Sequence, residues 1–82
     1  MKLPRNLAGT DLARALQVLG YRITRQTGSH LRLTTTEHGE HHITIPRHNP
    51  LKIGTLAGIL RDVAEHFGTT RDDLAVRLFG ET

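Results

Sequence analysis

The sequence predicts an α+β fold of two layers, in which helices cover one face of a three-stranded antiparallel sheet. Apolar residues repeat with a helical period in residues 11–19 and 56–67, and they alternate with polar residues between positions 21 and 45. Glycines and prolines separate these segments. The element order is therefore αβββα plus a short C-terminal helix, in a single domain over residues 1–82.

The first helix is expected over Asp11–Leu19. Thr10 is a suitable N-cap, and Gly20 is suited to end the helix because glycine readily adopts the left-handed conformation. The apolar side of this helix consists of Leu12, Ala15, Leu16 and Leu19. Their spacing of three and four residues forms one stripe, which predicts burial against the sheet.

Three strands are expected next, joined by a tight turn and a polar loop. The turn is Thr27-Gly28-Ser29, where we expect Gly28 to take the positive φ of a short hairpin. The loop is residues 37–40, and Pro46 ends the third strand. The residues expected to face the core are Tyr21, Ile23, Leu31, Leu33, Ile43 and Ile45.

The opposite face of the sheet is predicted to be polar and open to a ligand. It is expected to carry basic and hydroxyl side chains and no carboxylate. Its expected members are Arg22, Thr24, Gln26, His30, Arg32, Thr34, His42 and Thr44.

After a loop over residues 46–54, the second long helix is expected over Leu56–Phe67, with Thr55 as its N-cap and Gly68 at its end. Thr70 and Asp73 then have the spacing that starts a last short helix, which ends before Gly80.

Charge is distributed unevenly along the chain. Residues 1–54 contain eight basic and three acidic side chains, whereas residues 55–82 contain three basic and five acidic ones. A basic half is typical of proteins that bind nucleic acid, although solvated basic surfaces are also common. The chain has no cysteine, which removes disulfides and thiolate sites and fits the cytoplasm. No apolar run is long enough for a membrane span, and the first five residues do not resemble a signal peptide.

His30 is the leading candidate for chemistry, because it opens the second strand directly after the turn and is expected to face solvent near Arg32. An imidazole titrates near neutral pH and can transfer protons. The alternative interpretation is an ordinary polar residue on a solvated strand.

Four short motifs occur in order along the chain: Gly20-Tyr21, Gly28-Ser29-His30, Pro46-Arg47-His48 and Gly54-Thr55-Leu56. In this order and spacing the sequence resembles the HicA family of mRNA interferase toxins, over nearly its whole length. The resemblance implies a fold similar to a double-stranded-RNA-binding domain, cleavage of mRNA with His30 as the catalytic residue, and a HicB-type antitoxin as partner. The chain departs from the family pattern in the histidines around residues 38–42 and at Asn49-Pro50.

RNA supplies its own nucleophile, the 2′-hydroxyl, so the expected cleavage needs no metal and no small-molecule cofactor. His30 would act as general base or acid. Arg32 and Lys52 would bind phosphate, as would the backbone at Thr55 at the start of a helix. Arg22 is a further RNA-binding candidate on the same face, and His48 either binds RNA or is the second proton-transfer group.

Two other functions are compatible with the sequence. One is an RNA-binding module without catalysis, which would read A-form RNA by its shape and 2′-hydroxyls. The other is a metal site built from His38, His41, His42 and His48. Adjacent strand residues such as His41 and His42 face opposite sides of a sheet, which disfavours a shared ion.

Overall fold

In a computed structural model, residues 3–80 are described. Residues 1–2, which belong to the segment that is expected not to be a signal peptide, lie outside the described residues, as do residues 81–82. The elements, in chain order, are α1 (Gly9–Ala15), the short 3-10 helix η1 (Leu16–Leu19), β1 (Arg22–Gln26), β2 (His30–Thr35), β3 (His41–Pro46), α2 (Ile53–Phe67) and α3 (Arg71–Phe79).

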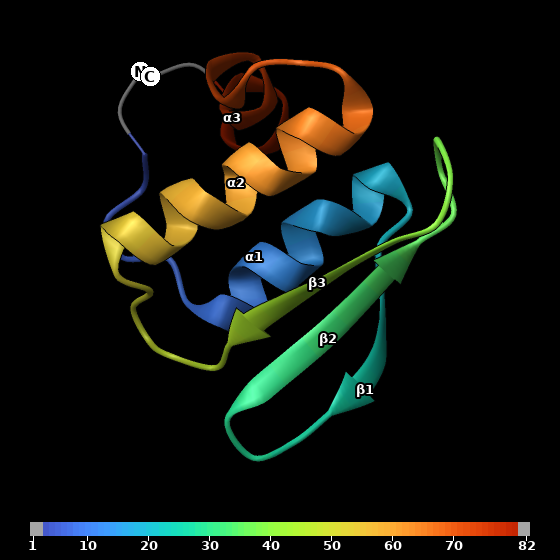
Figure 1. The fold of residues 1–82 in the computed structure, drawn as a ribbon. Helices are drawn as coiled ribbons and strands as arrows, with labels where there is room; N and C mark the ends of the chain where they lie inside the picture. Colours follow the sequence, from blue (N-terminus) through green and yellow to red (C-terminus); the bar gives the residue numbers. More distant parts are fainter. Residues whose placement is uncertain (1–2, 81–82) are drawn as a thin grey trace.

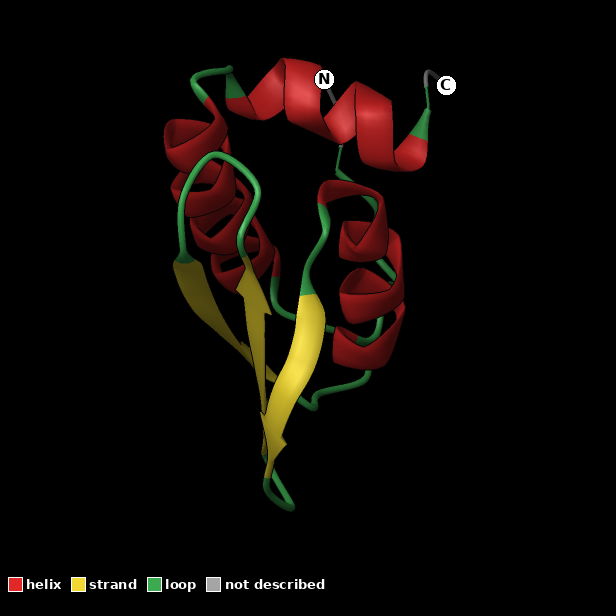
Figure 2. Cartoon of the chain, turned by 90° about the vertical axis from the view of Figure 1, so that its right-hand side faces the viewer, coloured by secondary structure: helices red, strands yellow, loops and turns green. Residues whose placement is uncertain are grey.

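The three strands form one antiparallel sheet in the order β1-β2-β3. Helices α1 and α2 lie side by side over one face of this sheet, and α3 packs across them at the end of α2 (Figure 1). Figure 2 shows the molecule turned by 90°, with α3 across the top, α1 and α2 below it and the strands at the lower end. No element within residues 3–80 covers the other face. This confirms the αβββα order with a C-terminal helix.

The core lies between the two layers and includes the predicted leucine and isoleucine stripes. Its fully buried side chains include Leu12, Leu16, Tyr21, Leu31, Leu33, Ile45, Leu56, Leu60, Val63 and Leu74. Removal of this apolar surface from water is the main force that holds the helices on the sheet. Among the described helices, none is long and apolar enough to cross a membrane.

The first helix starts earlier than predicted. Its N-cap is Ala8, not Thr10, because the Asp11 carboxylate accepts a hydrogen bond from the Ala8 amide at 3.1 Å and stabilises the first turn. The helix tightens to a 3-10 turn from Leu16, and Gly20 ends it in the left-handed conformation, as expected.

Helix α2 also starts earlier, at Ile53, with Lys52 as its N-cap. Thr55 therefore lies within the first turn and is not the cap. The end at Gly68 is confirmed. The start of α3 is confirmed as well, because the Thr70 hydroxyl accepts from the Asp73 amide at 3.1 Å.

Strand β1 contains an irregularity that the alternating pattern did not predict. Its register against β2 shifts between Ile23 and Arg25, so that Thr24 is an extra residue. Beyond the shift, Arg25 pairs with Arg32 and Gln26 pairs with Leu31. Paired residues point to the same side of a sheet, so Gln26 faces the helices, and its predicted place on the outer face is wrong.

Ile23 is the second correction on this strand. It pairs with buried Leu33, yet half of its surface is exposed because β1 is an edge strand.

The turn before β2 closes without a positive φ at Gly28. Thr27 and His30 make two bonds across it: the Thr27 amide donates to the His30 carbonyl at 2.9 Å, and the Thr27 hydroxyl accepts from the His30 amide at 3.0 Å. Because a side chain replaces the Thr27 carbonyl as acceptor, the turn avoids the left-handed conformation that we expected.

Candidate functional site

His30 is exposed on the bare face of the sheet, at the end where β2 begins. Its ring is oriented by Ser29, whose Oγ lies 2.9 Å from the ring Nδ1. Among the described residues, no partner bonds Nε2. When Nδ1–H donates to Ser29, the lone pair of Nε2 faces solvent, and when the hydroxyl donates instead, Nε2 carries the proton. The ring can therefore offer either a base or an acid to a ligand.

Two arginines lie directly opposite each other next to this histidine. Arg32 is exposed two residues along β2 from His30, and the shift in β1 places Arg25 across from it. Like charges that face each other across a strand pair repel, and an anion between them removes this repulsion. Strict alternation assigns Gln26 to this face, so the sequence did not predict Arg25 here.

The other predicted binding residues are divided between two regions. Arg22 is on the outer face but at the opposite end of the sheet from His30, since its register partner is Thr34. His48 and Lys52 are exposed in the segment that leaves β3 beside the His30 turn. Arg47 fixes this segment, because its amide donates to the Ser29 carbonyl at 2.8 Å and its guanidinium donates to the Thr27 carbonyl at 3.4 Å.

Thr55 is half-buried in the first turn of α2, in the helical layer. The described structure thus brings His48 and Lys52 toward the His30 end of the fold, while Thr55 belongs to the layer behind the sheet.

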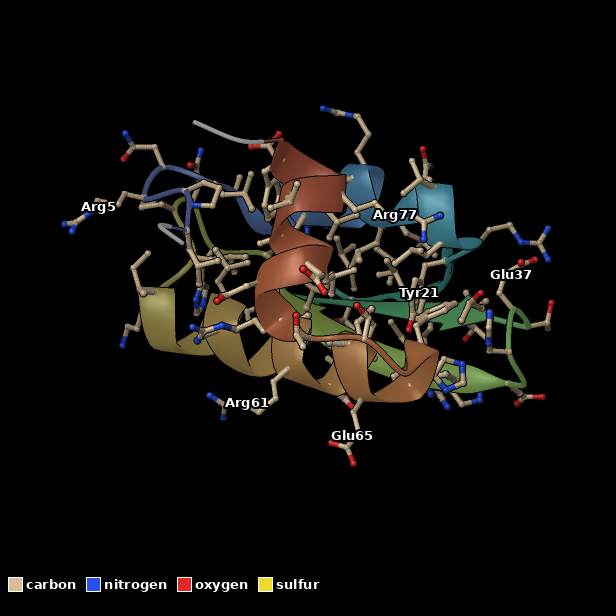
Figure 3. The ribbon with its side chains drawn as sticks, turned by 90° about the horizontal axis from the view of Figure 1, so that it is seen from above. Arg5, Tyr21, Glu37, Arg61, Glu65 and Arg77 are labelled. Carbon is tan, nitrogen blue, oxygen red and sulfur yellow. The ribbon has the colours of Figure 1, made fainter. Side chains whose placement is uncertain are left out.

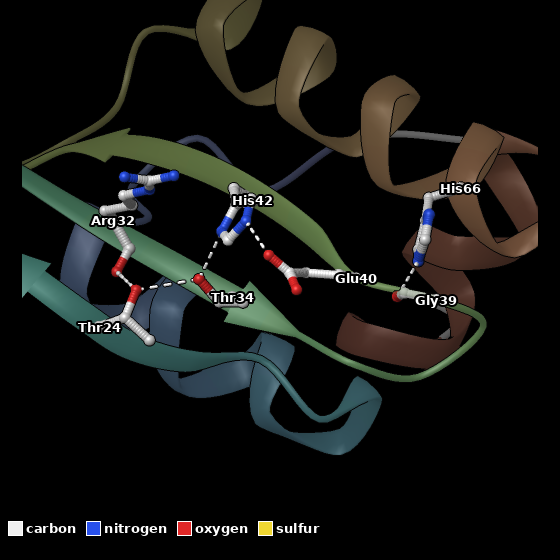
Figure 4. Close-up of polar contacts among 7 residues, drawn as sticks. All are labelled: Thr24, Arg32, Thr34, Gly39, Glu40, His42 and His66. Carbon is white, nitrogen blue, oxygen red and sulfur yellow. Dashed lines mark hydrogen bonds and ion pairs between the residues drawn. The ribbon is translucent and has the colours of Figure 1, made fainter.

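Within residues 3–80 a carboxylate does lie on the outer face, which corrects the prediction of none. Glu40, in the loop before β3, lies 2.7 Å from His42 Nε2, and His42 Nδ1 lies 2.7 Å from the Thr34 hydroxyl (Figure 4). This group is at the end of the sheet away from His30.

A second group of histidines lies on the helical side. The Tyr21 hydroxyl is 2.7 Å from His41 Nδ1, His41 Nε2 is 3.3 Å from Asp62, and the rings of His41 and His66 stack at 4.3 Å. Burial, and next the charge of Asp62, raises the pKa of Tyr21 to about 12. Figure 3 shows Tyr21 between the helices and the sheet, while Glu65 projects from α2.

His66 fixes the β2–β3 loop in this group. Its Nε2 lies 2.9 Å from the Glu37 carbonyl and 3.1 Å from the Gly39 carbonyl. We interpret the group as structural, because Tyr21 is fully buried and its hydroxyl is occupied by His41.

The histidines do not combine into a metal site in this structure. His41 and His42 face opposite sides of the sheet, as the sequence predicts. Over residues 3–80, no group of three histidine, aspartate or glutamate side chains is arranged to hold an ion.

These features define a small two-layer α+β protein with a bare sheet face that carries an exposed histidine beside paired arginines. The family model of the HicA toxin of bacterial toxin–antitoxin systems matches residues 9–64, which is more than half of the chain. The protein therefore belongs to the HicA toxin family. No curated protein and no solved structure matches the chain significantly.

Proposed function

We propose that this toxin is a metal-independent endoribonuclease that cleaves mRNA in the cytoplasm, with His30 as its catalytic residue. The observation that carries this proposal is the position of His30. It is exposed, oriented by Ser29 at 2.9 Å, and next to the opposed pair Arg25 and Arg32 on an uncovered sheet face. The arginines would hold a phosphate while the imidazole transfers the proton.

In the proposed reaction, His30 removes the proton from a ribose 2′-hydroxyl, and the 2′-oxygen attacks the adjacent phosphorus. The bond from phosphorus to the 5′-oxygen breaks, and an acid protonates that oxygen. The products are a 2′,3′-cyclic phosphate and a 5′-hydroxyl. Arg25 and Arg32 would stabilise the charge that develops on the phosphate oxygens. His48 is the candidate for the acid, because its segment is tied to the His30 turn through Arg47.

Arg22 and Lys52 would extend the binding surface to neighbouring phosphates, which supply most of the salt-dependent affinity of a nucleic-acid complex. Thr55 would contribute only through its backbone at the start of α2. That backbone amide lies in the first turn of α2, whose N-cap is Lys52, whereas the Leu56 amide already donates to the Lys52 carbonyl at 3.0 Å.

The direct test is cleavage of a synthetic single-stranded RNA by the purified protein in EDTA. We expect fragments that end in a 2′,3′-cyclic phosphate and begin with a 5′-hydroxyl. RNA that is bound but not cut would instead support the alternative, an RNA-binding module without catalysis. Fragments with 3′-hydroxyl and 5′-phosphate ends, or cleavage that EDTA abolishes, would contradict the mechanism.

The family implies an antitoxin, and we propose that a HicB-type protein with an acidic surface covers His30 and Arg32. Complementary charge would favour this contact. Co-purification at low salt, followed by modification with a histidine reagent, tests it. We expect His30 to be protected in the complex, and a reactive His30 would show that the antitoxin binds elsewhere.

A further inference from the structure

Glu40 and His42 belong to a hydrogen-bond chain that crosses the outer face of the sheet (Figure 4). Glu40 Oε2 is 2.7 Å from His42 Nε2, His42 Nδ1 is 2.7 Å from the Thr34 hydroxyl, and that hydroxyl is 2.9 Å from the hydroxyl of Thr24. A carboxylate only accepts, so a neutral His42 donates from Nε2 and accepts from Thr34 at Nδ1. This series of hydrogen bonds fixes the orientation of the Glu40 carboxylate and of the His42 ring.

Glu40 differs in chemistry from the rest of this face. The charged side chains that the outer face of the described strands otherwise presents are arginines, and its uncharged polar groups are hydroxyls and imidazoles. The cations suit phosphate oxygens, whereas the carboxylate repels them. A carboxylate accepts hydrogen bonds from N–H donors, and the second oxygen of Glu40 has no partner among the described residues. Its side chain is 68% exposed, so that oxygen is accessible.

The position of this pair separates it from the proposed cleavage site. His42 is opposite Thr34, and Pro46 is opposite His30, so the two histidines are four register positions apart. At about 3.3 Å per residue the separation is roughly 13 Å, which is too far for both rings to act on one phosphate. An RNA strand that lies along the face from His30 would reach His42 with a different nucleotide.

We propose that Glu40 and His42 form a base-reading subsite for single-stranded RNA, which selects bases with an exocyclic amino group over uracil. The partly exposed ring of His42 offers a face on which a base stacks. The free oxygen of Glu40 accepts from the amino group of that base, as carboxylates accept from the N4 amino group of cytosine. Uracil has a carbonyl oxygen at the equivalent position, which the carboxylate repels. This inference rests on the proposed action on RNA.

The test compares the affinity for oligocytidylate with that for oligouridylate, because these two ligands differ in the group that Glu40 would read. The full chain carries His30→Ala so that the RNA stays intact. We expect cytidylate to bind at least about fivefold more tightly, the lower range for a specific base contact. Adding Glu40→Gln should reduce the ratio to within about twofold, because an amide both donates and accepts.

Glu37→Gln is the matched control. It removes the same charge from the same loop, but the Glu37 side chain lies against Gly20 and is not part of the hydrogen-bond chain through His42, so the ratio should not change. Equal affinities for the two RNAs would overturn the inference, and so would a preference that Glu40→Gln leaves intact. If Glu40→Gln weakens antitoxin binding and leaves the preference unchanged, the carboxylate contacts the protein partner and the inference is wrong. The readout is binding, so a failure of cleavage by the unmodified protein is a separate result.

Discussion

Arg25 and Arg32 face each other across β1 and β2 on the uncovered side of the sheet. This arrangement destabilises the free protein slightly, by about 0.2–1 kcal/mol for like charges in directly opposed positions. In the proposed function, an RNA phosphate held between the two guanidinium groups would offset this repulsion.

Replacement of Arg25 should lower the affinity for RNA without lowering the stability of the fold. We expect Arg25→Gln to leave the free energy of unfolding unchanged or slightly higher, because repulsion is relieved. RNA affinity should fall, and the slope of log affinity against log salt should decrease by about 0.7, the value for one phosphate contact on a single strand. Urea unfolding and RNA titrations at several salt concentrations measure both. Arg61→Gln on α2, whose side chain points away from the sheet (Figure 3), is the control and should change neither.

Ser29 is expected to act by positioning the His30 ring. Ser29→Ala removes the hydrogen bond to Nδ1, and we expect kcat to fall about fivefold, from the loss of roughly 1 kcal/mol, with KM unchanged. Ser29→Thr keeps the hydroxyl and should restore most of the rate. If alanine and threonine reduce kcat equally, the hydroxyl does not position the ring.

The sequence predicted the order of elements well because helical and strand periods are properties of local sequence. Both long helices, the alternation in β2 and β3, and the glycines after Leu19 and Phe67 are confirmed. The predicted starts of α1 and α2 were wrong by two or three residues, because the Asp11 carboxylate accepts from the Ala8 amide and α2 begins without a side-chain cap. These outcomes depend on how each loop packs, which the periodicity does not encode.

The site was predicted less completely for two physical reasons. The shift at Thr24 arises from strand pairing and cannot be read from β1 alone, so Arg25 was missed and Gln26 was misplaced. Glu40 lies in the loop before β3 and reaches His42 from there. The alternation of strand residues does not predict which way a loop side chain points. The exposed position of His30 at the start of β2 was predictable, because the turn and the strand that place it are contiguous in sequence.

Gly9 and Gly28 should respond very differently to alanine. A Cβ on Gly9 would overlap the Pro46 carbonyl oxygen, because the Gly9 amide donates to the His48 carbonyl and holds α1 against this segment. We expect Gly9→Ala to lower the free energy of unfolding by about 1–3 kcal/mol, the usual cost of overpacking. Gly28 has open space and no positive φ, so Gly28→Ala should not destabilise. Denaturant unfolding of both variants tests this contrast, and equal losses would contradict the account.

The raised pKa of Tyr21 predicts how the free energy of unfolding changes at alkaline pH. Its pKa is about 12 in the folded protein against 10.0 ordinarily, chiefly through burial and then through Asp62. The unfolded chain therefore loses this proton first as pH rises. The contribution to stability is complete below pH 10 and is lost progressively toward pH 12.

This tyrosine is the only one in the chain, so its ultraviolet absorbance reports the titration directly. Unfolding measured across the same range should show the decline in the unmodified protein and a weaker decline in Tyr21→Phe. A tyrosinate that forms near pH 10 in the folded protein would show that burial does not protect the hydroxyl.

The central claim is that His30 cuts RNA without a metal, and the comparison of His30→Ala with the unmodified protein tests it most directly. Cleavage rate and RNA affinity are measured on the same single-stranded RNA in EDTA. We expect the rate to fall by about 10²–10⁴-fold, the span for loss of a proton-transfer group, while affinity stays nearly constant because the arginines remain. A variant that cuts as fast as the unmodified protein would contradict the assignment of His30.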